Sequence, residues 1–180
     1  MIRTATPKDI PPIAAIYAEA VRTGTASFEL EPATEVEMER RFRTLTEGGF
    51  PYLVAELDGA VAGYAYAGPH RPRPAYRFTV ENSVYVAPHW QGKGVGRALL
   101  TALIADCETR GFRQMIAVIG DSANAGSVKL HAATGFEMVG TMKSVGRKFG
   151  QWLDTPIMQR ALGVGDRAVP DHEPGDDPAS

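Results

Sequence analysis

The chain has 180 residues, with 19 Lys and Arg against 21 Asp and Glu, a formal net charge of −2 and 44% hydrophobic residues. This length suits one domain with a full core, and a charge near zero argues against a nucleic-acid-binding protein, which would usually be basic. One cysteine excludes internal disulfides and a cysteine-rich zinc module, and there is no apolar run of roughly 18 residues to span a membrane. The first residues also lack the apolar stretch of a signal peptide, so we expect a cytoplasmic enzyme or small-molecule-binding protein.

The composition changes near residue 162. Residues 163–180 hold three prolines, five acids and one base, so they carry −4 and leave +2 on the rest of the chain. Such a segment has too little apolar surface to offset the entropy lost on ordering. We therefore predict one folded domain over residues 1–162 and a disordered acidic tail, rich in Pro and Gly, over residues 163–180, without a catalytic role.

The first half of the chain alternates between strand and helix patterns. A short strand is expected at residues 2–4, and Thr6-Pro7-Lys8-Asp9 is typical of a helix start, with a hydroxyl N-cap, Pro at N1 and an acid at N3. An apolar helix face follows at helical spacing, made of Ile10, Ile13, Ala14, Tyr17 and Val21. A second helix is expected over residues 36–46. Strands over 52–56 and 61–66 flank Asp58-Gly59, which is a hairpin signal.

The second half continues the alternation. The predicted elements are a strand over 79–86, a helix over 94–110, a strand over 115–119, a helix over 124–133 and two strands over 136–145 and 152–159. The order β-α-α-β-β-β-α-β-α-β-β predicts an α/β or α+β domain built on one mixed sheet.

A glycine loop joins the predicted strand 79–86 to the next helix, with the sequence Gln91-Gly-Lys-Gly-Val-Gly-Arg97. Glycines let backbone N–H groups approach a ligand closely, and a helix N-terminus adds unpaired donors and positive partial charge, so the loop suits a phosphate or pyrophosphate. Lys93 and Arg97 add charge. A dinucleotide fingerprint would need glycine where Arg97 stands, and a P-loop would need Ser or Thr where Gly94 follows Lys93, so neither motif is present.

Gln91 to Gly96 instead matches the pattern Q/R-x-x-G-x-G/A, and resembles the acetyl-CoA pyrophosphate loop of the GCN5-related N-acetyltransferase (GNAT) superfamily. Further segments resemble its phosphinothricin and methionine sulfoximine N-acetyltransferase branch: residues 79–86, 117–120, 127–131, 135–136 and 148–154. The resemblance runs from about residue 2 to residue 160. It implies the GNAT fold, in which a mixed, mostly antiparallel central sheet is flanked by helices and its splayed centre binds acetyl-CoA.

The resemblance also implies how the donor, acetyl-CoA, is held. Backbone groups of Val84, Tyr85 and Val86 are expected to pair with the pantetheine arm like an added strand, and an N–H there to polarise the thioester carbonyl. The pyrophosphate is expected at the glycine loop, on Gly92, Lys93, Gly94, Val95, Gly96 and Arg97. Asn124 is expected to cap the helix predicted over residues 124–133, to contact acetyl-CoA, or to do both.

Acetyl transfer to an amine needs a proton acceptor, because an α-amine is largely protonated at neutral pH. Strand alternation places Glu81 on the same strand face as Ser83 and Tyr85, opposite the face of the valines. The residue types alone also allow a solvated glutamate with no role in catalysis. The resemblance favours Glu81 as the catalytic base. His131 shares a helix stripe with Asn124 and Ser127, where many members of the superfamily use a tyrosine to protonate the leaving thiolate. An imidazole can act as acid or base, so the division of roles between Glu81 and His131 stays open, and a structural histidine is the alternative.

The loop over residues 70–77 is rich in Arg and stiffened by Pro. The planar fork of Arg matches carboxylate, sulfonyl or phosphinate oxygens, although a solvated basic loop has the same composition. The resemblance implies an amino-acid pocket lined by Phe28, Arg71, Pro72, Arg73, Tyr76, Arg77, Glu81, Asn82 and Ser83. It also implies a homodimer, with Phe149 and Trp152 at the dimer contact or in the core.

These observations predict an acyltransferase that moves acetyl from acetyl-CoA to the α-amine of a small amino acid such as methionine sulfoximine, methionine sulfone or phosphinothricin. We expect direct attack, because no activated nucleophile is visible; Cys107 lies on an apolar helix face. The histidines show no metal-ligand spacing, so no metal is predicted, and neither nucleic acid nor membrane is an expected partner. The alternatives are acetylation of a peptide N-terminus or another amine, and a non-catalytic acetyl-CoA-binding regulatory module.

Overall fold

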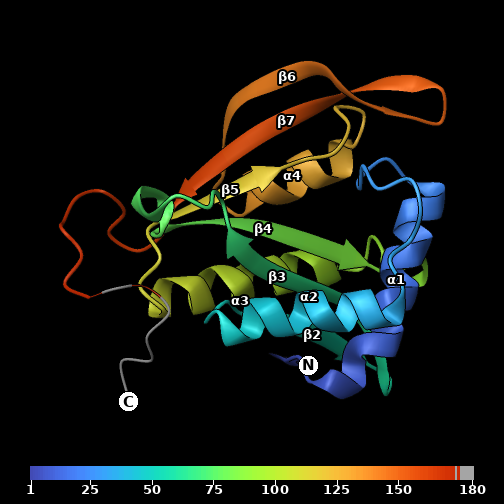
Figure 1. The fold of residues 1–180 in the computed structure, drawn as a ribbon, viewed down its shortest axis with the longest axis horizontal. Coiled ribbons are helices and arrows are strands. Elements are labelled where there is room, and N and C mark those ends of the chain that lie inside the picture. Colours follow the sequence, from blue (N-terminus) through green and yellow to red (C-terminus); the bar gives the residue numbers. More distant parts are fainter. Residues whose placement is uncertain (173, 175–180) are drawn as a thin grey trace.

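The computed structural model describes residues 1–172 and residue 174 (Figure 1). In this part of the chain seven strands form one sheet in the order β1-β2-β3-β4-β5-β7-β6, and the predicted succession of strands and helices is confirmed. The elements are β1 (Ile2–Thr4), α1 (Ile10–Thr23), α2 (Glu35–Glu47), β2 (Tyr52–Leu57), β3 (Ala60–Pro69), β4 (Thr79–Val86), α3 (Val95–Thr109), β5 (Gln114–Val118), α4 (Ala125–Ala133), β6 (Glu137–Lys148) and β7 (Gln151–Ala161). Short 3-10 helices lie at Pro7–Asp9, Pro74–Tyr76 and Pro88–Trp90.

The sheet opens at its centre, between β4 and β5. These two strands pair in parallel, residues 79–82 of β4 with residues 114–117 of β5. Beyond this point β4 stays paired with β3 as far as Val86, whereas β5 stays with β7, and the two strands diverge (Figure 1). The edge of residues 83–86 that faces β5 therefore has no strand beside it, which confirms the predicted mostly antiparallel sheet with a splayed centre.

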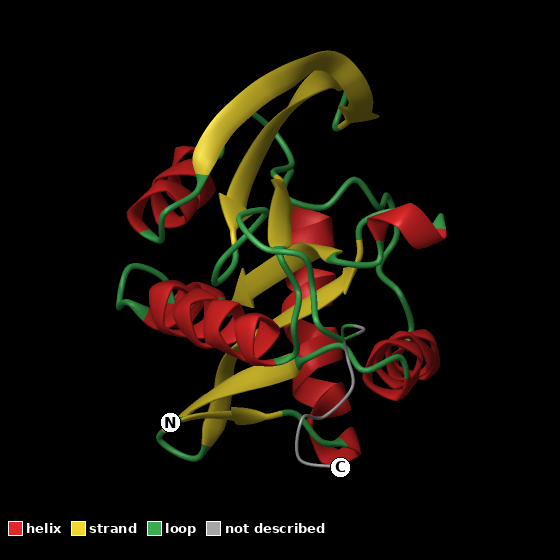
Figure 2. Ribbon diagram, turned by 90° about the vertical axis from the view of Figure 1, so that its left-hand side faces the viewer, coloured by secondary structure: helices red, strands yellow, loops and turns green. Residues whose placement is uncertain are grey.

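Helices cover the two faces of the sheet (Figure 2). Helices α1 and α2 pack on the face that carries Tyr52, Tyr64 and Tyr85, and α3 packs on the other face through Leu99 and its neighbours. Because side chains alternate along a strand, residues 81, 83 and 85 of β4 point to the α1/α2 face, and residues 80, 82 and 84 point to the α3 face. This division decides which residues of β4 meet on each side of the gap.

Local sequence signals set several element ends. The backbone N–H of Thr6 donates to Oδ2 of Asp9 at 2.7 Å, although this start forms a 3-10 turn and α1 itself begins at Ile10. Thr34 caps α2 by accepting from the N–H of Glu37. Asp58 and Gly59 have φ values of +50° and +75°, the paired positive values of a type I′ hairpin turn. These helix starts and this hairpin turn were predictable because each depends on a few neighbouring residues.

The β6–β7 hairpin arches away from the body of the sheet (Figure 2), and its strand register is interrupted between Met142 and Gly146. After β7 the chain turns back: the N–H of Gly165 donates to the carbonyl of Leu162 at 2.8 Å, and Arg113 donates to the carbonyl of Gly165 at 3.3 Å. The predicted disordered tail includes residues 173 and 175–180, which lie outside the described residues, so the domain boundary at residue 162 stays a prediction. None of the helices described is long and apolar enough to span a lipid bilayer.

Candidate active site

The gap between β4 and β5 opens into a cavity of about 590 Å³, a size typical of small-molecule sites. One wall is β4 from Asn82 to Val86, and the other runs along β5 to Gly120. The cavity brings together many residues that the sequence singled out: Asn82, Ser83, Val84, Tyr85, Val86, Gly92, Gly94, Val95, Gly96, Arg97, Asn124 and His131.

The glycine loop presents its backbone to this cavity. Gly92 and Gly94 have φ values of +71° and +84°, and no atom lies within 4 Å of where a Cβ would stand on either residue. Gly94 is also the N-cap of α3 and has no side chain to cap it, so the first N–H groups of the helix lack intrahelical partners. Gln91 ties the loop to β4 by donating to the carbonyl of Val86 at 3.1 Å. This arrangement of donors and open space fits a pyrophosphate.

Two predicted donor-site residues take different positions. Lys93 is not part of the cavity wall; its Nζ lies 4.8 Å from the centre of the Trp90 ring, in a cation–π contact. Asn124 lines the cavity and also caps α4, because its Oδ1 accepts from the N–H of Ser127 at 3.2 Å. The side-chain cap restricts the rotation of the Asn124 side chain at the cavity wall.

His131 is buried on α4, with 4% of its surface exposed. Its Nδ1 lies 2.8 Å from the carbonyl of Ser127, which can only accept, so Nδ1 carries the proton. Its Nε2 lies 2.9 Å from Nδ2 of Asn82, so Nε2 accepts. Burial lowers the pKa of His131 below its ordinary value of 6.5, and the bond to Ser127 opposes this only in part. The imidazole is therefore neutral at physiological pH, with both nitrogens paired.

Glu81 lies on the other side of β4 from His131. It stands opposite Gly68 of β3, and its Oε2 lies 3.4 Å from Nδ1 of His70. The Glu81 side chain is 39% exposed and does not line the cavity between β4 and β5. The two predicted acid–base residues are thus not brought into contact: Glu81 projects from one face of the sheet, two residues before the open edge of β4, and His131 lies on the opposite face beside Asn82.

The Arg-rich loop forms a cavity of its own, of about 270 Å³. The predicted acceptor residues Arg71, Pro72, Arg73, Tyr76 and Arg77 all line it, together with Phe50 and Phe112. The structure therefore groups these five residues but separates them from Ser83 and Asn82, which belong to the larger cavity. His70 connects the loop to Glu81, since it precedes Arg71 in the chain and its ring contacts the Glu81 carboxylate.

Phe28, the remaining predicted acceptor residue, lies on the loop between α1 and α2. Its ring packs over Gly146 of β6, where a Cβ would overlap it. Lys148, at the end of β6, is buried, and its Nζ donates to the carbonyl of Ser27 at 2.8 Å. The sequence analysis did not identify Lys148, because no local pattern shows that the end of β6 meets a loop about 120 residues earlier.

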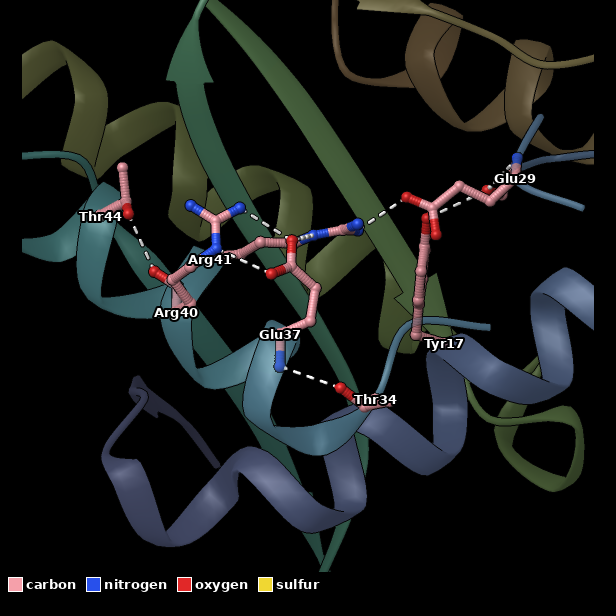
Figure 3. A network of polar contacts seen from close by, with 8 residues as sticks. Tyr17, Glu29, Thr34, Glu37, Arg40, Arg41 and Thr44 are labelled. Carbon is pink, nitrogen blue, oxygen red and sulfur yellow. Dashed lines mark hydrogen bonds and ion pairs between the residues drawn. The ribbon is translucent and has the colours of Figure 1, made fainter. Parts of the chain in front are cut away.

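A polar network beside this loop was also missed (Figure 3). Arg41 of α2 donates to Glu29 at 2.7 Å and to Glu37 at 2.8 Å, and Figure 3 shows Glu29 reaching towards Tyr17 of α1. The Glu37–Arg41 pair has helical i,i+4 spacing and was detectable from the sequence. The bond to Glu29 was not, because it depends on how the loop folds over α2.

Among the described residues, no three or more His, Cys, Asp and Glu side chains gather as metal ligands would. Cys107 is buried on α3, and burial raises the pKa of its thiol, so it is not an activated nucleophile. What the geometry offers is a cavity beside a helix start whose free N–H groups suit a pyrophosphate, an open strand edge, and two ionisable side chains, Glu81 and His131, on opposite faces of the sheet. These parts define an acyltransferase that uses a coenzyme A thioester.

Comparison with known proteins identifies the family. Residues 2–157 match the family model described as an acetyltransferase (GNAT) domain, and the chain belongs to this family. It is 55% identical over 170 residues to a phosphinothricin N-acetyltransferase of Alcaligenes faecalis, covering 94% of this chain and 86% of that protein. It is 45% identical over 162 residues to an L-methionine sulfoximine/L-methionine sulfone acetyltransferase of Pseudomonas aeruginosa, covering 89% and 94%.

A solved structure shows the same fold with its donor bound. A phosphinothricin acetyltransferase of Sinorhizobium meliloti, in complex with acetyl-CoA, superposes with a TM-score of 0.94 at 49% identity, covering 99% of this chain and 96% of that one. The predicted GNAT fold, acyltransferase activity and acetyl-CoA co-substrate are therefore confirmed. The unpaired N–H groups at the start of α3 and the open edge of β4 are the features of this chain that fit acetyl-CoA.

Proposed function

We propose that this enzyme acetylates the α-amine of a small amino acid whose side chain ends in polar oxygens, such as methionine sulfoximine, methionine sulfone or phosphinothricin. The observation that carries the proposal is the position of Glu81, which lies two residues before the open edge of β4 and contacts His70 at the start of the Arg-rich loop. The relatives named for phosphinothricin and for methionine sulfoximine and sulfone support the same substrate class. An amino acid would place its amine at Glu81 and its oxygens at the loop.

In this proposal acetyl-CoA enters between β4 and β5. Val84, Tyr85 and Val86 pair with the pantetheine arm through their backbone groups, because this edge of β4 has no strand beside it. The N–H groups of residues 92–97 bind the pyrophosphate, with Arg97 at the cavity wall and Lys93 adding charge nearby. Asn124 lies at the same cavity and is assigned to the donor.

The chemistry begins with proton removal. Glu81 takes a proton from the acceptor ammonium, and the free amine attacks the thioester carbonyl, whose developing oxyanion is stabilised by an N–H of β4. The new C–N bond forms, the C–S bond breaks, and the second proton of the nitrogen passes to the leaving sulfur. His131 suits this second transfer, because its neutral Nε2 can take up a proton when Asn82 moves aside and then deliver it.

The acceptor is held by the groups around Glu81. Arg71, Arg73 and Arg77 offer planar forks for the carboxylate and side-chain oxygens, and Pro72 and Tyr76 shape the same loop. Ser83 lies on the same face as Glu81, two residues further along β4, and Phe28 forms the wall contributed by the α1–α2 loop. Asn82 acts from the opposite face, through His131.

We also propose that the enzyme is a homodimer joined through the β6–β7 hairpin and that it works in the cytoplasm, where acetyl-CoA is made. Large apolar side chains are exposed on this hairpin, including Trp152, which is 67% exposed, and Val139, Phe149, Val145 and Met138. An apolar surface of this kind marks an interaction site. Sedimentation should show a dimer that Trp152→Asp weakens; a wild-type chain that stays monomeric at micromolar concentration contradicts the dimer.

The substrate proposal is tested by measuring CoA release from acetyl-CoA with a panel of acceptors. The panel holds methionine sulfone, methionine sulfoximine, phosphinothricin, plain amino acids, spermidine and a peptide with a free N-terminus. We expect turnover on the first three and little on spermidine or the peptide. Turnover confined to spermidine or the peptide contradicts the amino-acid pocket, and tight acetyl-CoA binding without turnover on any acceptor favours a regulatory module.

A further inference from the structure

His70 lies at the start of the Arg-rich loop, beside Glu81, and is partly exposed to solvent. It follows β3 directly, and its backbone N–H donates to the carbonyl of Thr79 at 3.3 Å, which extends the β3–β4 ladder by one residue. Strand alternation therefore points its ring to the same face as Glu81. Glu81 stands opposite Gly68, and a glycine leaves no side chain between the carboxylate and the ring diagonal to it. Nδ1 of His70 lies 3.4 Å from Oε2 of Glu81 as a result.

The His70 ring contacts Glu81 on one side and is partly exposed to solvent, so a proton could enter it from Glu81 and leave it to water. The titratable groups in contact with it are Glu81 from β4 and Tyr76 from the 3-10 helix Pro74–Tyr76, whose ring centre is 6.0 Å away; Arg71 is the adjoining charged residue in the chain. The His70 side chain is 21% exposed, so it has access to water. Glu81 itself is exposed in the free enzyme, but an amino acid whose amine is bound at Glu81 would cover it.

We propose that His70 is the proton exit of the active site: it takes from Glu81 the proton that the acceptor ammonium gave up and releases it to solvent. This proposal rests on the proposed role of Glu81 as the base. In the step, His70 is the tautomer protonated at Nε2: the O–H bond of the protonated carboxyl breaks, an N–H bond forms at Nδ1, and the carboxylate is regenerated. The imidazolium then loses its Nε2 proton to water or buffer, and exchange with water restores the tautomer protonated at Nε2.

A relay residue can be distinguished from a structural one by chemical rescue. His70→Ala opens a space beside Glu81 that free imidazole can enter, and His70→Gln keeps a hydrogen-bonding side chain that cannot carry a proton. We expect kcat to fall roughly tenfold or more in both variants, and added imidazole to restore most of the rate in His70→Ala alone. His172→Ala is the control, because His172 lies beside Gly111, away from the site; its rate should match the wild type and not respond to imidazole.

Each other result overturns the relay. Wild-type kcat in either His70 variant means that Glu81 passes its proton directly to water or needs only a hydrogen-bond partner, and a loss that imidazole cannot restore means that His70 is structural. If His70→Ala does not fold, the reduced kcat of His70→Gln and its flattened dependence on buffer concentration serve the same test. Glu81→Gln separates this proposal from the function: when Glu81→Gln is inactive and both His70 variants are active, only the relay fails.

Discussion

The conformation of Gly94 allows a sharp test of the donor site. Gly94 has a φ of +84° at the start of α3, where an L-residue costs about 1–2 kcal/mol. Gly59, in the turn between β2 and β3, has a φ of +75° and equally open space around it, but it does not line the cavity. Gly94→Ala and Gly59→Ala therefore introduce similar backbone strain at two places, one at the cavity and one outside it.

The two variants should differ in acetyl-CoA affinity rather than in stability. If the loop relieves the strain at residue 94 by moving φ to negative values, the N–H groups at the start of α3 turn away from the pyrophosphate. A hydrogen bond to a charged group contributes about 1.5–3 kcal/mol, so the loss of one such bond weakens binding by roughly 10- to 150-fold. If the loop keeps its shape, the added Cβ occupies the space in front of it and also opposes binding.

Urea unfolding without ligand and calorimetric titration with acetyl-CoA measure the two quantities separately. We expect both variants to lose about 1–2 kcal/mol in the free energy of unfolding, and the Gly94→Ala variant alone to bind acetyl-CoA at least tenfold more weakly. Wild-type affinity in Gly94→Ala would refute the argument that these N–H groups hold the donor. An equal loss of affinity in Gly59→Ala would show that backbone strain acts on the whole fold rather than on the loop.

Three further predictions concern ionisable groups. Glu81→Gln should lower kcat/KM by roughly 10²–10⁴ and leave the acetyl-CoA dissociation constant unchanged; a loss confined to acetyl-CoA binding contradicts a base. Because burial lowers the pKa of His131 below 6.5, the unfolded chain takes up a proton that the folded one does not, so the free energy of unfolding should fall as pH drops through 6.5. His131→Gln should reduce that fall in urea unfolding at pH 7.5 and 5.5, and an unchanged fall assigns it to other groups. The Arg3 guanidinium lowers the pKa of Asp9 from 3.8 to about 2, so the stability it contributes is complete above pH 3.8 and lost as pH falls through 2. Asp9→Asn should cost about 2 kcal/mol at pH 7, and a stability equal to that of the wild type by urea unfolding contradicts the pairing.

The sequence predicted those parts of the fold whose causes are local. The strand Thr79–Val86 was placed with its observed ends, because Pro88 closes it and the glycine loop follows. The hairpin turn at Asp58-Gly59 was also correct, since its two positive φ values suit these residues. By contrast, β3 extends three residues beyond the predicted end, to Pro69, because pairing with β4 continues there. No periodicity within β3 itself indicates where its neighbour ends.

The position of His70 could not be predicted for the same reason. Its contact with Glu81 spans 11 residues and depends on the register that sets Gly68 opposite Glu81. A shift of the register by one residue would turn one of the two side chains to the other face. The sequence showed which residues of β4 share a face, but not how β3 and β4 are aligned. It therefore identified Glu81 as a candidate base without identifying His70 as its neighbour.

The opposite placement of Glu81 and His131 follows from the topology. Adjacent residues of a strand point to opposite faces, so Glu81 and Asn82 had to diverge; what the sequence could not supply was that α4 lies on the Asn82 face. The parallel pair β4–β5 requires a crossover through α3, and such crossovers are right-handed, which fixes the face on which α3 lies. For the proposed chemistry, this placement puts Glu81 in a partly exposed environment and His131 in a buried one. In the proposed relay the Glu81 carboxylate passes its proton to water through His70, whereas the buried, neutral imidazole of His131 can keep a proton within the site during transfer from nitrogen to sulfur.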